Sequence, residues 1–199
     1  MLPAEIKNFI DYFSKLPSIG PRMATRLAFY LISLDKSSLE NITNAFFSIK
    51  KLSRCGQCFF IKNYAETICG ICSSPKRDKN FIAIVEKDID ILSLEKTKKF
   101  NGHYFVLGAL AEKGFFETVQ KLRLENLKNR LKKESNDKIR EIIVAVSSNS
   151  FGDVSYNLLV KELSDLAEKI TRLGRGLPTG GEIEFADEST LESALDNRG

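Results

Sequence analysis

The sequence contains no apolar run that approaches the ~20 residues needed for a membrane-spanning helix. It also begins without a hydrophobic signal segment, and it shows no internal repeat or low-complexity stretch. These absences predict a globular protein of a reducing, cytoplasmic compartment with no membrane partner. With 199 residues, 43% of them hydrophobic, the chain is long enough to bury a core in one or two domains.

Cysteine is scarce, and all of it lies in two Cys-x-x-Cys pairs with ten residues between them: Cys55 and Cys58, then Cys69 and Cys72. Two intervening residues allow both sulfurs of a tight turn to bind one metal ion, and Gly56 and Gly70 are expected to adopt positive φ there. We therefore predict one Zn²⁺ per chain. Four thiolates leave no open position for water, so the ion would be structural and would help a small ribbon to fold.

Disulfides and redox chemistry are the alternatives for these cysteines. Disulfides require an oxidising compartment, and a thioredoxin-like motif requires one Cys-x-x-Cys pair beside a βαβ unit rather than two facing pairs. Both alternatives are therefore less favoured than zinc.

Residues 5–16 carry apolar side chains at helical spacing, and a second helix is expected over residues 22–31. Between them Ile19 precedes Gly20, which is expected to take the turn, and Pro21 suits the first position of the second helix. This is the pattern of a helix-hairpin-helix DNA-binding motif, in which free N–H groups and the neighbouring Arg22 and Arg26 contact phosphate. The alternative is an αα-corner that binds nothing.

Charge is unevenly distributed around a net value of +4. Residues 1–79 hold 12 Lys and Arg against 6 Asp and Glu, whereas the rest of the chain holds 18 against 20, and the segment from Glu182 is acidic. We therefore expect the N-terminal region, residues 1–79, to be the part that binds anions. Residues 37–40 form a Ser-x-x-Glu capping box that would open a third helix, and a basic run follows it at Lys50, Lys51 and Arg54.

Beyond residue 80 the sequence alternates between apolar strands and helices. Strands are expected at 81–86, 103–107, 142–146 and 171–173, and helices at 88–97, 112–133 and 153–169. Such alternation predicts a mostly parallel sheet covered on both faces. The lone histidine, His103, falls in a strand and is expected to be structural or on the surface.

Glu86 ends the first of these strands, where ligands bind in open α/β sheets. A Mg²⁺ site would need further carboxylates there, yet no Asp-x-Asp follows the strand at 142–146. Asp88 and Asp90 are explained as acidic residues in the first turn of a helix. We therefore expect no catalytic residue in this region.

In this order, the hairpin, the four-cysteine ribbon and the α/β region resemble the RecR family of bacterial recombination mediators over nearly the whole chain. The resemblance is carried by residues 16–29, the four cysteines, residues 84–86 with 90–95, and above all residues 173–191. It implies an α+β multi-module fold with four parts: a helix-hairpin-helix region at 1–53, a four-cysteine zinc finger at 54–79, a Toprim-like domain at 80–176 and a C-terminal assembly segment at 177–199.

The resemblance also implies a function. Members of the family are non-enzymatic clamps that bind DNA without sequence preference as homo-oligomers, from dimers to tetrameric rings, and that work with RecO and RecF to load RecA on gapped single-stranded DNA. Glu86 and Asp90 would be non-catalytic Toprim acids, and the protein would be nucleoid-associated. A Toprim nuclease or primase relative and a zinc-ribbon adaptor that binds only protein are the alternatives.

The chain departs from the family pattern at two places. Residues 148–153 replace a Pro-Thr-Val-Glu-Gly-Glu segment, so that Phe151 stands where the family has its first glutamate. The resemblance therefore does not carry the family's mediator contacts to this surface. Residues 108–118 lack the usual Ser-Pro and Gly-x-x-Pro elements, and a differently shaped crossover is expected there.

Overall fold

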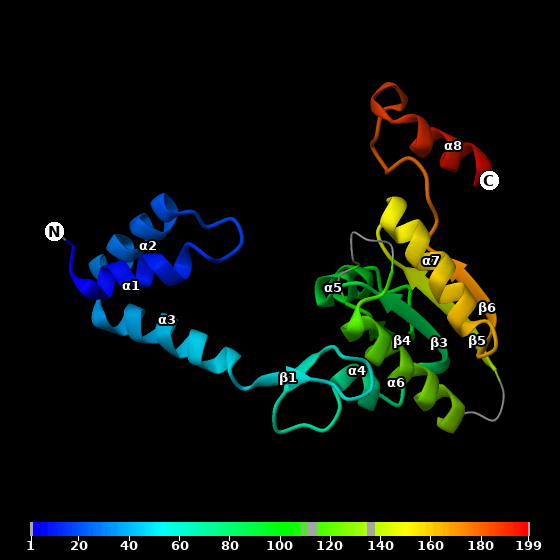
Figure 1. The fold of residues 1–199 in the computed structure, drawn as a ribbon, viewed down its shortest axis with the longest axis horizontal. Helices are drawn as coiled ribbons and strands as arrows, with labels where there is room; N and C mark the ends of the chain where they lie inside the picture. Colours follow the sequence, from blue (N-terminus) through cyan, green and yellow to red (C-terminus); the bar gives the residue numbers. More distant parts are fainter. Residues whose placement is uncertain (1, 109, 111–114, 135–137, 199) are drawn as a thin grey trace. The chain divides into compact units, whose positions relative to one another are not determined.

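A computed structural model describes residues 2–108, 110, 115–134 and 138–198. The chain divides into two compact units, Met1–Leu52 and Ser53–Gly199, and each is described by itself (Figure 1). Among the described residues, no helix is both long enough and apolar enough to cross a membrane.

The first unit consists of three helices: α1 (Ala4–Phe13), α2 (Pro21–Ser33) and α3 (Lys36–Ile49). Pro21 occupies the start of α2 as expected, because its fixed φ suits that position. The N-cap of α3 was predicted wrongly: it is Asp35, whose carboxylate accepts hydrogen bonds from the amide (3.0 Å) and the hydroxyl (2.6 Å) of Ser38, and not Ser37. The aspartate carboxylate accepts both hydrogen bonds at once, and this cap is favoured over the capping-box pattern that begins two residues later.

The core of the first unit is thin. Only the small residues Ala24 and Ala28, both on α2, are buried among its described side chains, and this lets the helices approach closely. Phe13 of α1 meets Phe46 of α3 edge to face, with ring centroids 6.0 Å apart. Several larger apolar side chains of the unit are more than one-third exposed, and Phe46 (52% exposed) and Phe47 (58%) are among them.

The second unit is built on a parallel sheet with the strand order β4-β3-β5-β6. Its strands are β3 (Asp78–Val85), β4 (Gly102–Val106), β5 (Ile139–Ala145) and β6 (Ala167–Arg172), and its crossover helices are α5 (Asp88–Lys96), α6 (Thr118–Glu134) and α7 (Ser150–Leu163). A small two-stranded sheet, β1 (Leu52–Arg54) with β2 (Ile61–Asn63), and the short helix α4 (Gly70–Ser73) carry the cysteines before it.

Side chains that alternate along the strands build a core on each face of the sheet. On one face, Ile82 and Ile84 of β3 pack with Leu127 of α6 and Leu159 of α7. On the other face, Ala83 and Val85 pack with Ile91 of α5. The prediction of a parallel sheet covered on both sides is therefore confirmed, and the buried His103 lies within β4 as a structural residue.

Several element boundaries were predicted wrongly. Asn149 caps α7 by accepting a hydrogen bond from the amide of Gly152 (2.9 Å), so the helix begins at Ser150 rather than at 153. It also ends at Leu163, and β6 begins at Ala167, because pairing with β5 overrides the helical spacing of apolar residues up to 169. Residues 115–117 are not helical, so α6 starts later than the expected 112.

The chain ends in a short 3-10 helix, η1 (Ile183–Phe185), and in α8 (Glu188–Asp196), which Asp187 caps by accepting a hydrogen bond from the amide of Thr190 (2.8 Å). Neither helix buries a side chain. The expected reshaping of the crossover at residues 108–118 falls largely on 109 and 111–114, which lie outside the described residues.

Candidate functional site

The four cysteines meet in one buried cluster. The Sγ atoms of Cys55, Cys58, Cys69 and Cys72 all lie within 4.8 Å of one another, and within the described part of the chain no other group of three or more His, Cys, Asp or Glu side chains could hold a metal ion. The turn after β1 supplies the first pair, and the second pair frames the start of α4, with Cys69 as its N-cap. This arrangement has the donor number and spacing of a tetrahedral thiolate site.

The thiols are also coupled electrostatically. The Sγ atoms of Cys58 and Cys69 are 3.4 Å apart, and this hydrogen bond raises the pKa of Cys58 and lowers the pKa of Cys69. Cys55 accepts a hydrogen bond from the amide of Cys69 (3.4 Å). One thiolate is thus stabilised by its neighbours, and a divalent cation would replace the shared protons and let all four sulfurs ionise.

The backbone conformation of the turns in the cysteine cluster differs from the prediction. Gly56 and Gly70 do not adopt positive φ; Phe59 does, at 61°, directly after Cys58. This conformation places the Phe59 ring against Phe105 of β4, with centroids 5.6 Å apart, and beneath the guanidinium of Arg123. The carbonyl of Cys58 accepts a hydrogen bond from the amide of Val106 (2.8 Å), so the cysteine module is joined to the sheet. Tyr64, which follows β2, is 76% exposed.

The hairpin presents backbone amides and two arginines. Gly20 is the N-cap of α2, and no side chain of the described residues accepts a hydrogen bond from the N–H groups of its first turn. Arg22 and Arg26 are exposed on α2, and neither forms an ion pair with any residue that the structure describes.

The turn of the hairpin again differs from the prediction. Gly20 is extended, with φ −88°, and the left-handed residue is Ser18, with φ 62°. The amide of Ile19 donates to the carbonyl of Leu16 (3.1 Å), which closes the loop. Gly20 therefore serves as an open N-cap whose missing side chain leaves the amides accessible.

The basic run after α3 does not leave three free charges. Lys50 caps the C-terminus of α3 and Lys51 follows it in a turn, both exposed. Arg54, in contrast, donates to the carboxylate of Asp88 (2.5 Å) and to the carbonyl of Phe59 (2.9 Å). Its charge is largely compensated within the second unit.

The acidic residues at the carboxyl edge of the sheet already have partners. Glu86 is buried, and its carboxylate accepts a hydrogen bond from the amide of Ser147 (2.5 Å), directly beyond β5. Asp88 pairs with Arg54, and Asp90 accepts from the amide of Lys87 (2.7 Å) at the start of α5. These side chains therefore stabilise the edge of the sheet.

The sequence-based prediction missed a charged cluster at the same edge. Asp153, in the first turn of α7, pairs through one oxygen with the guanidinium groups of both Arg172 and Arg175. The two arginines lower the pKa of Asp153 by hydrogen bonding to its carboxylate. An Arg-x-x-Arg sequence at the end of a strand was the available signal, but the acid lies about 20 residues earlier on another element. Phe151, at the altered family position, is also in the first turn of α7 and is 41% exposed.

A helical hairpin, a four-thiol centre and an open parallel sheet in one chain define a modular α+β protein. Family profiles match in the same order: "RecR, helix-hairpin-helix" at residues 6–46, "Toprim domain" at 80–174 and "RecR, C-terminal" at 176–198.

Curated relatives agree over the full length. Proteins described as "Recombination protein RecR" are 35% identical in Chloroflexus aggregans (100% of this chain, 95% of the relative) and in Thermobifida fusca (100% and 98%), and 38% identical in Clostridium perfringens (98% and 96%). The chain therefore belongs to the RecR family, and the predicted fold class is confirmed. Membership supports a role in recombinational DNA repair.

Proposed function

We propose that this protein is a non-enzymatic DNA clamp that acts with RecO and RecF to load RecA on gapped single-stranded DNA. The observation that carries the proposal is the hairpin, where uncapped amides of α2 lie beside Arg22 and Arg26. Amides and point charges of this kind bind phosphates without reading bases. We propose that the chain has four domains, at residues 1–53, 54–79, 80–176 and 177–199.

The metal of the proposed clamp is one structural zinc ion. The fit rests on the chemistry of the donors, since four buried thiols that meet within 4.8 Å suit a soft tetrahedral cation. Cys55, Cys58, Cys69 and Cys72 would hold it. With every position filled by sulfur, the ion would fix the ribbon against β4 and supply no open site for chemistry.

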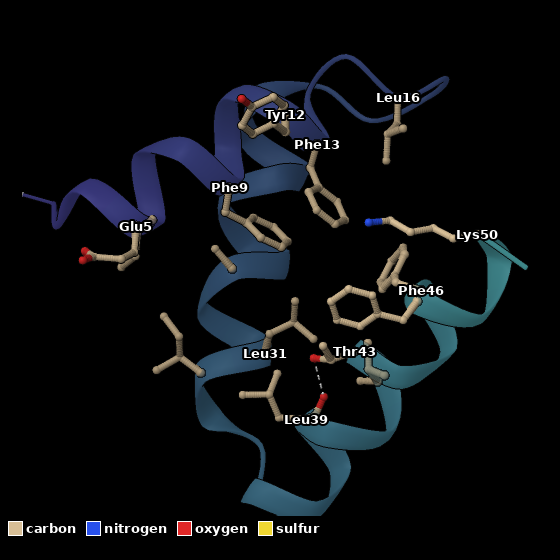
Figure 2. Close-up of a pocket in the computed structure, with 15 residues that line it drawn as sticks. Glu5, Phe9, Tyr12, Phe13, Leu16, Leu31, Leu39, Thr43, Phe46 and Lys50 are labelled. Atoms are coloured by element: carbon tan, nitrogen blue, oxygen red, sulfur yellow. Dashed lines mark hydrogen bonds between the residues drawn. The ribbon is translucent and has the colours of Figure 1, made fainter.

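Ring assembly is the second part of the proposal, and an apolar groove in the first unit supports it. The groove has a volume of about 730 Å³ and lies among α1, α2 and α3. Phe9, Phe13 and Phe46 line it, with Tyr12 and Lys50 at its margin (Figure 2). Phe46 and Phe47 of this lining are more than half exposed, so a second copy of the chain is the proposed occupant. The exposed side chains of Ile183 and Phe185 suit a C-terminal role in the same assembly.

The absence of enzymatic activity is part of the same proposal. Glu86, Asp88 and Asp90 each have a protein partner, so binding Mg²⁺ would require breaking those contacts. The alternative, a Toprim nuclease or primase relative, is favoured only by the position of Glu86 after β3. Mg²⁺-dependent nicking that disappears in Glu86→Ala would establish that alternative.

The double variant Arg22→Glu with Arg26→Glu tests the DNA contact. We expect it to lose DNA binding while its zinc content and oligomeric mass stay unchanged. Each lost phosphate contact lowers the slope of log K against log salt by about one unit, so single variants should each flatten the salt dependence.

Lys96→Glu with Lys99→Glu is the matched control, because it makes the same change in charge on exposed residues of the second unit. This control should bind DNA nearly as well as the wild type. If the hairpin variant kept wild-type affinity and salt dependence, the DNA contact would lie elsewhere, with Lys50 and Lys51 as the next candidates.

A further inference from the structure

A second polar site lies in the second unit and shares no residue with the hairpin or the cysteines. It is a cavity of about 290 Å³ between the end of β6 and the end of α8, which is near the lower limit of small-ligand pockets. Its lining contains cationic and neutral side chains and backbone but no carboxylate: Tyr156, Arg172, Leu173, Gly174, Arg175 and Asn197.

The positive charge of the two arginines at this cavity is only partly neutralised by nearby carboxylates. Arg172 and Arg175 share a single carboxylate oxygen, Oδ1 of Asp153, and no other ion pair to either arginine occurs among the described residues. Arg172 also donates to the carbonyl of Ser147 (3.2 Å), which carries no net charge. Two guanidinium groups facing one carboxylate leave an excess of one positive charge.

The donors of the two arginines are not all used. In the described part of the chain, the Nε atoms of Arg172 and Arg175 are buried and donate no hydrogen bond. These two atoms have almost no accessible surface, so an anion in the cavity would reach the terminal nitrogens instead, and Arg175 uses only Nη2 of these, on Asp153. The guanidinium of Arg172 is held over the ring of Tyr156, 5.5 Å from its centroid, so the cluster is already oriented.

From this cluster we propose that Arg172 and Arg175 bind a phosphate group in the cavity at the end of β6. A guanidinium offers parallel N–H donors that match two oxygens of a tetrahedral oxyanion, and arginine pairs are suited to phosphate for this reason. Gly174 has nothing within 4 Å of its Cβ direction, so the backbone between the arginines leaves room for the anion. The group can come from inorganic phosphate or from the backbone of DNA.

Inorganic phosphate is the first probe. The melting temperature of the full-length protein is measured against increasing sodium phosphate, with sodium chloride at the same ionic strength as the reference. Phosphate that binds the folded state should raise the melting temperature and the effect should saturate. Arg175→Gln should remove the rise, whereas the exposed Arg140→Gln on β5 should keep it.

Asp153→Asn separates a phosphate site from a purely structural cluster. Loss of the competing carboxylate frees both guanidinium groups, so phosphate should bind about tenfold more tightly. If the cluster is only structural, phosphate should not raise the melting temperature of the protein. The proposal is wrong if phosphate gives no rise in the wild type, if Arg175→Gln keeps the full rise, or if Asp153→Asn weakens the effect. If Asp153→Asn does not fold, Arg175→Lys decides, because one retained charge should give a partial rise.

DNA binding identifies the source of the phosphate. Because the hairpin variant Arg22→Glu with Arg26→Glu leaves the cavity unchanged, failure of the hairpin proposal does not affect the phosphate titration. If the cavity takes DNA phosphate, Asp153→Asn should strengthen DNA binding and inorganic phosphate should compete with DNA. If it takes free phosphate alone, DNA affinity should be the same in Asp153→Asn and in the wild type.

Discussion

At the scale of single residues, Gly152, in the first turn of α7, has the least room for a side chain among the described glycines. A Cβ atom there would lie 1.8 Å from the carbonyl oxygen of Ser147, a backbone atom. Gly152→Ala should therefore displace the start of α7 and lower the free energy of unfolding by about 1–3 kcal/mol. Thermal and denaturant unfolding of the full-length protein measure this effect.

Gly174→Ala is the matched control, because its Cβ would meet nothing within 4 Å. It should leave stability unchanged or raise it slightly, since alanine restricts the unfolded chain. Equal stability of the two variants would show that the loop before α7 rearranges at little cost.

At this scale the sequence predicted features that depend on residues close together in the chain, and it did not predict features that depend on packing. The cysteine cluster was predictable, because four residues at fixed spacing define it. The residues with positive φ were not predictable from the sequence. Ser18 and Phe59 adopt positive φ, whereas Gly20, Gly56 and Gly70 do not. Backbone strain of that kind is set by packing, as with the Phe59 ring on Phe105, and packing is not encoded in residue type alone.

At the scale of elements, the cysteine module should depend on its metal. Its two strands have three residues each and α4 has four, and its buried side chains are the cysteines themselves. Cys58→Ser or Cys72→Ser should therefore abolish zinc binding and yield a poorly folded or poorly assembled protein. Metal analysis and melting temperature, with and without a chelator, measure both effects.

Gly56→Ala serves as the control, because it changes the same turn, meets nothing within 4 Å and keeps all four ligands. This variant should retain one zinc ion per chain. A zinc-free protein that melts at the same temperature as the zinc-loaded form would contradict a structural role for the metal.

The order of helices and strands was predictable from the sequence, but the residues at which they begin and end were less predictable. The apolar strands and the alternation with helices follow from periodicity, which gave the parallel sheet. Single hydrogen bonds decided the boundaries instead: the carboxylate of Asp35 starts α3 and the amide oxygen of Asn149 starts α7. The cluster of Asp153 with Arg172 and Arg175 could not be predicted, because it requires the register of β6 relative to α7.

At the scale of the whole molecule, the apolar groove among α1, α2 and α3 is the feature on which the proposed assembly depends. Phe47 lines the groove and is 58% exposed, so it contributes little to the fold of the single chain. A closed ring of weakly binding hairpins gains affinity for DNA through multivalency, because each chain supplies another set of phosphate contacts. Assembly and DNA affinity should therefore fall together when the groove is damaged.

Phe47→Asp should break this interface, since a carboxylate buried in an apolar contact costs several kcal/mol, on the order of the energy of an interface hot spot. Light scattering should give a lower mass than the wild type, and DNA affinity should fall while zinc content and melting of the single chain are kept. Tyr64→Asp, at an exposed aromatic of the cysteine module, is the control and should keep the wild-type mass. A Phe47→Asp protein with unchanged mass would show that copies of the chain assemble through another surface, and the exposed Ile183 and Phe185 would be the next to test.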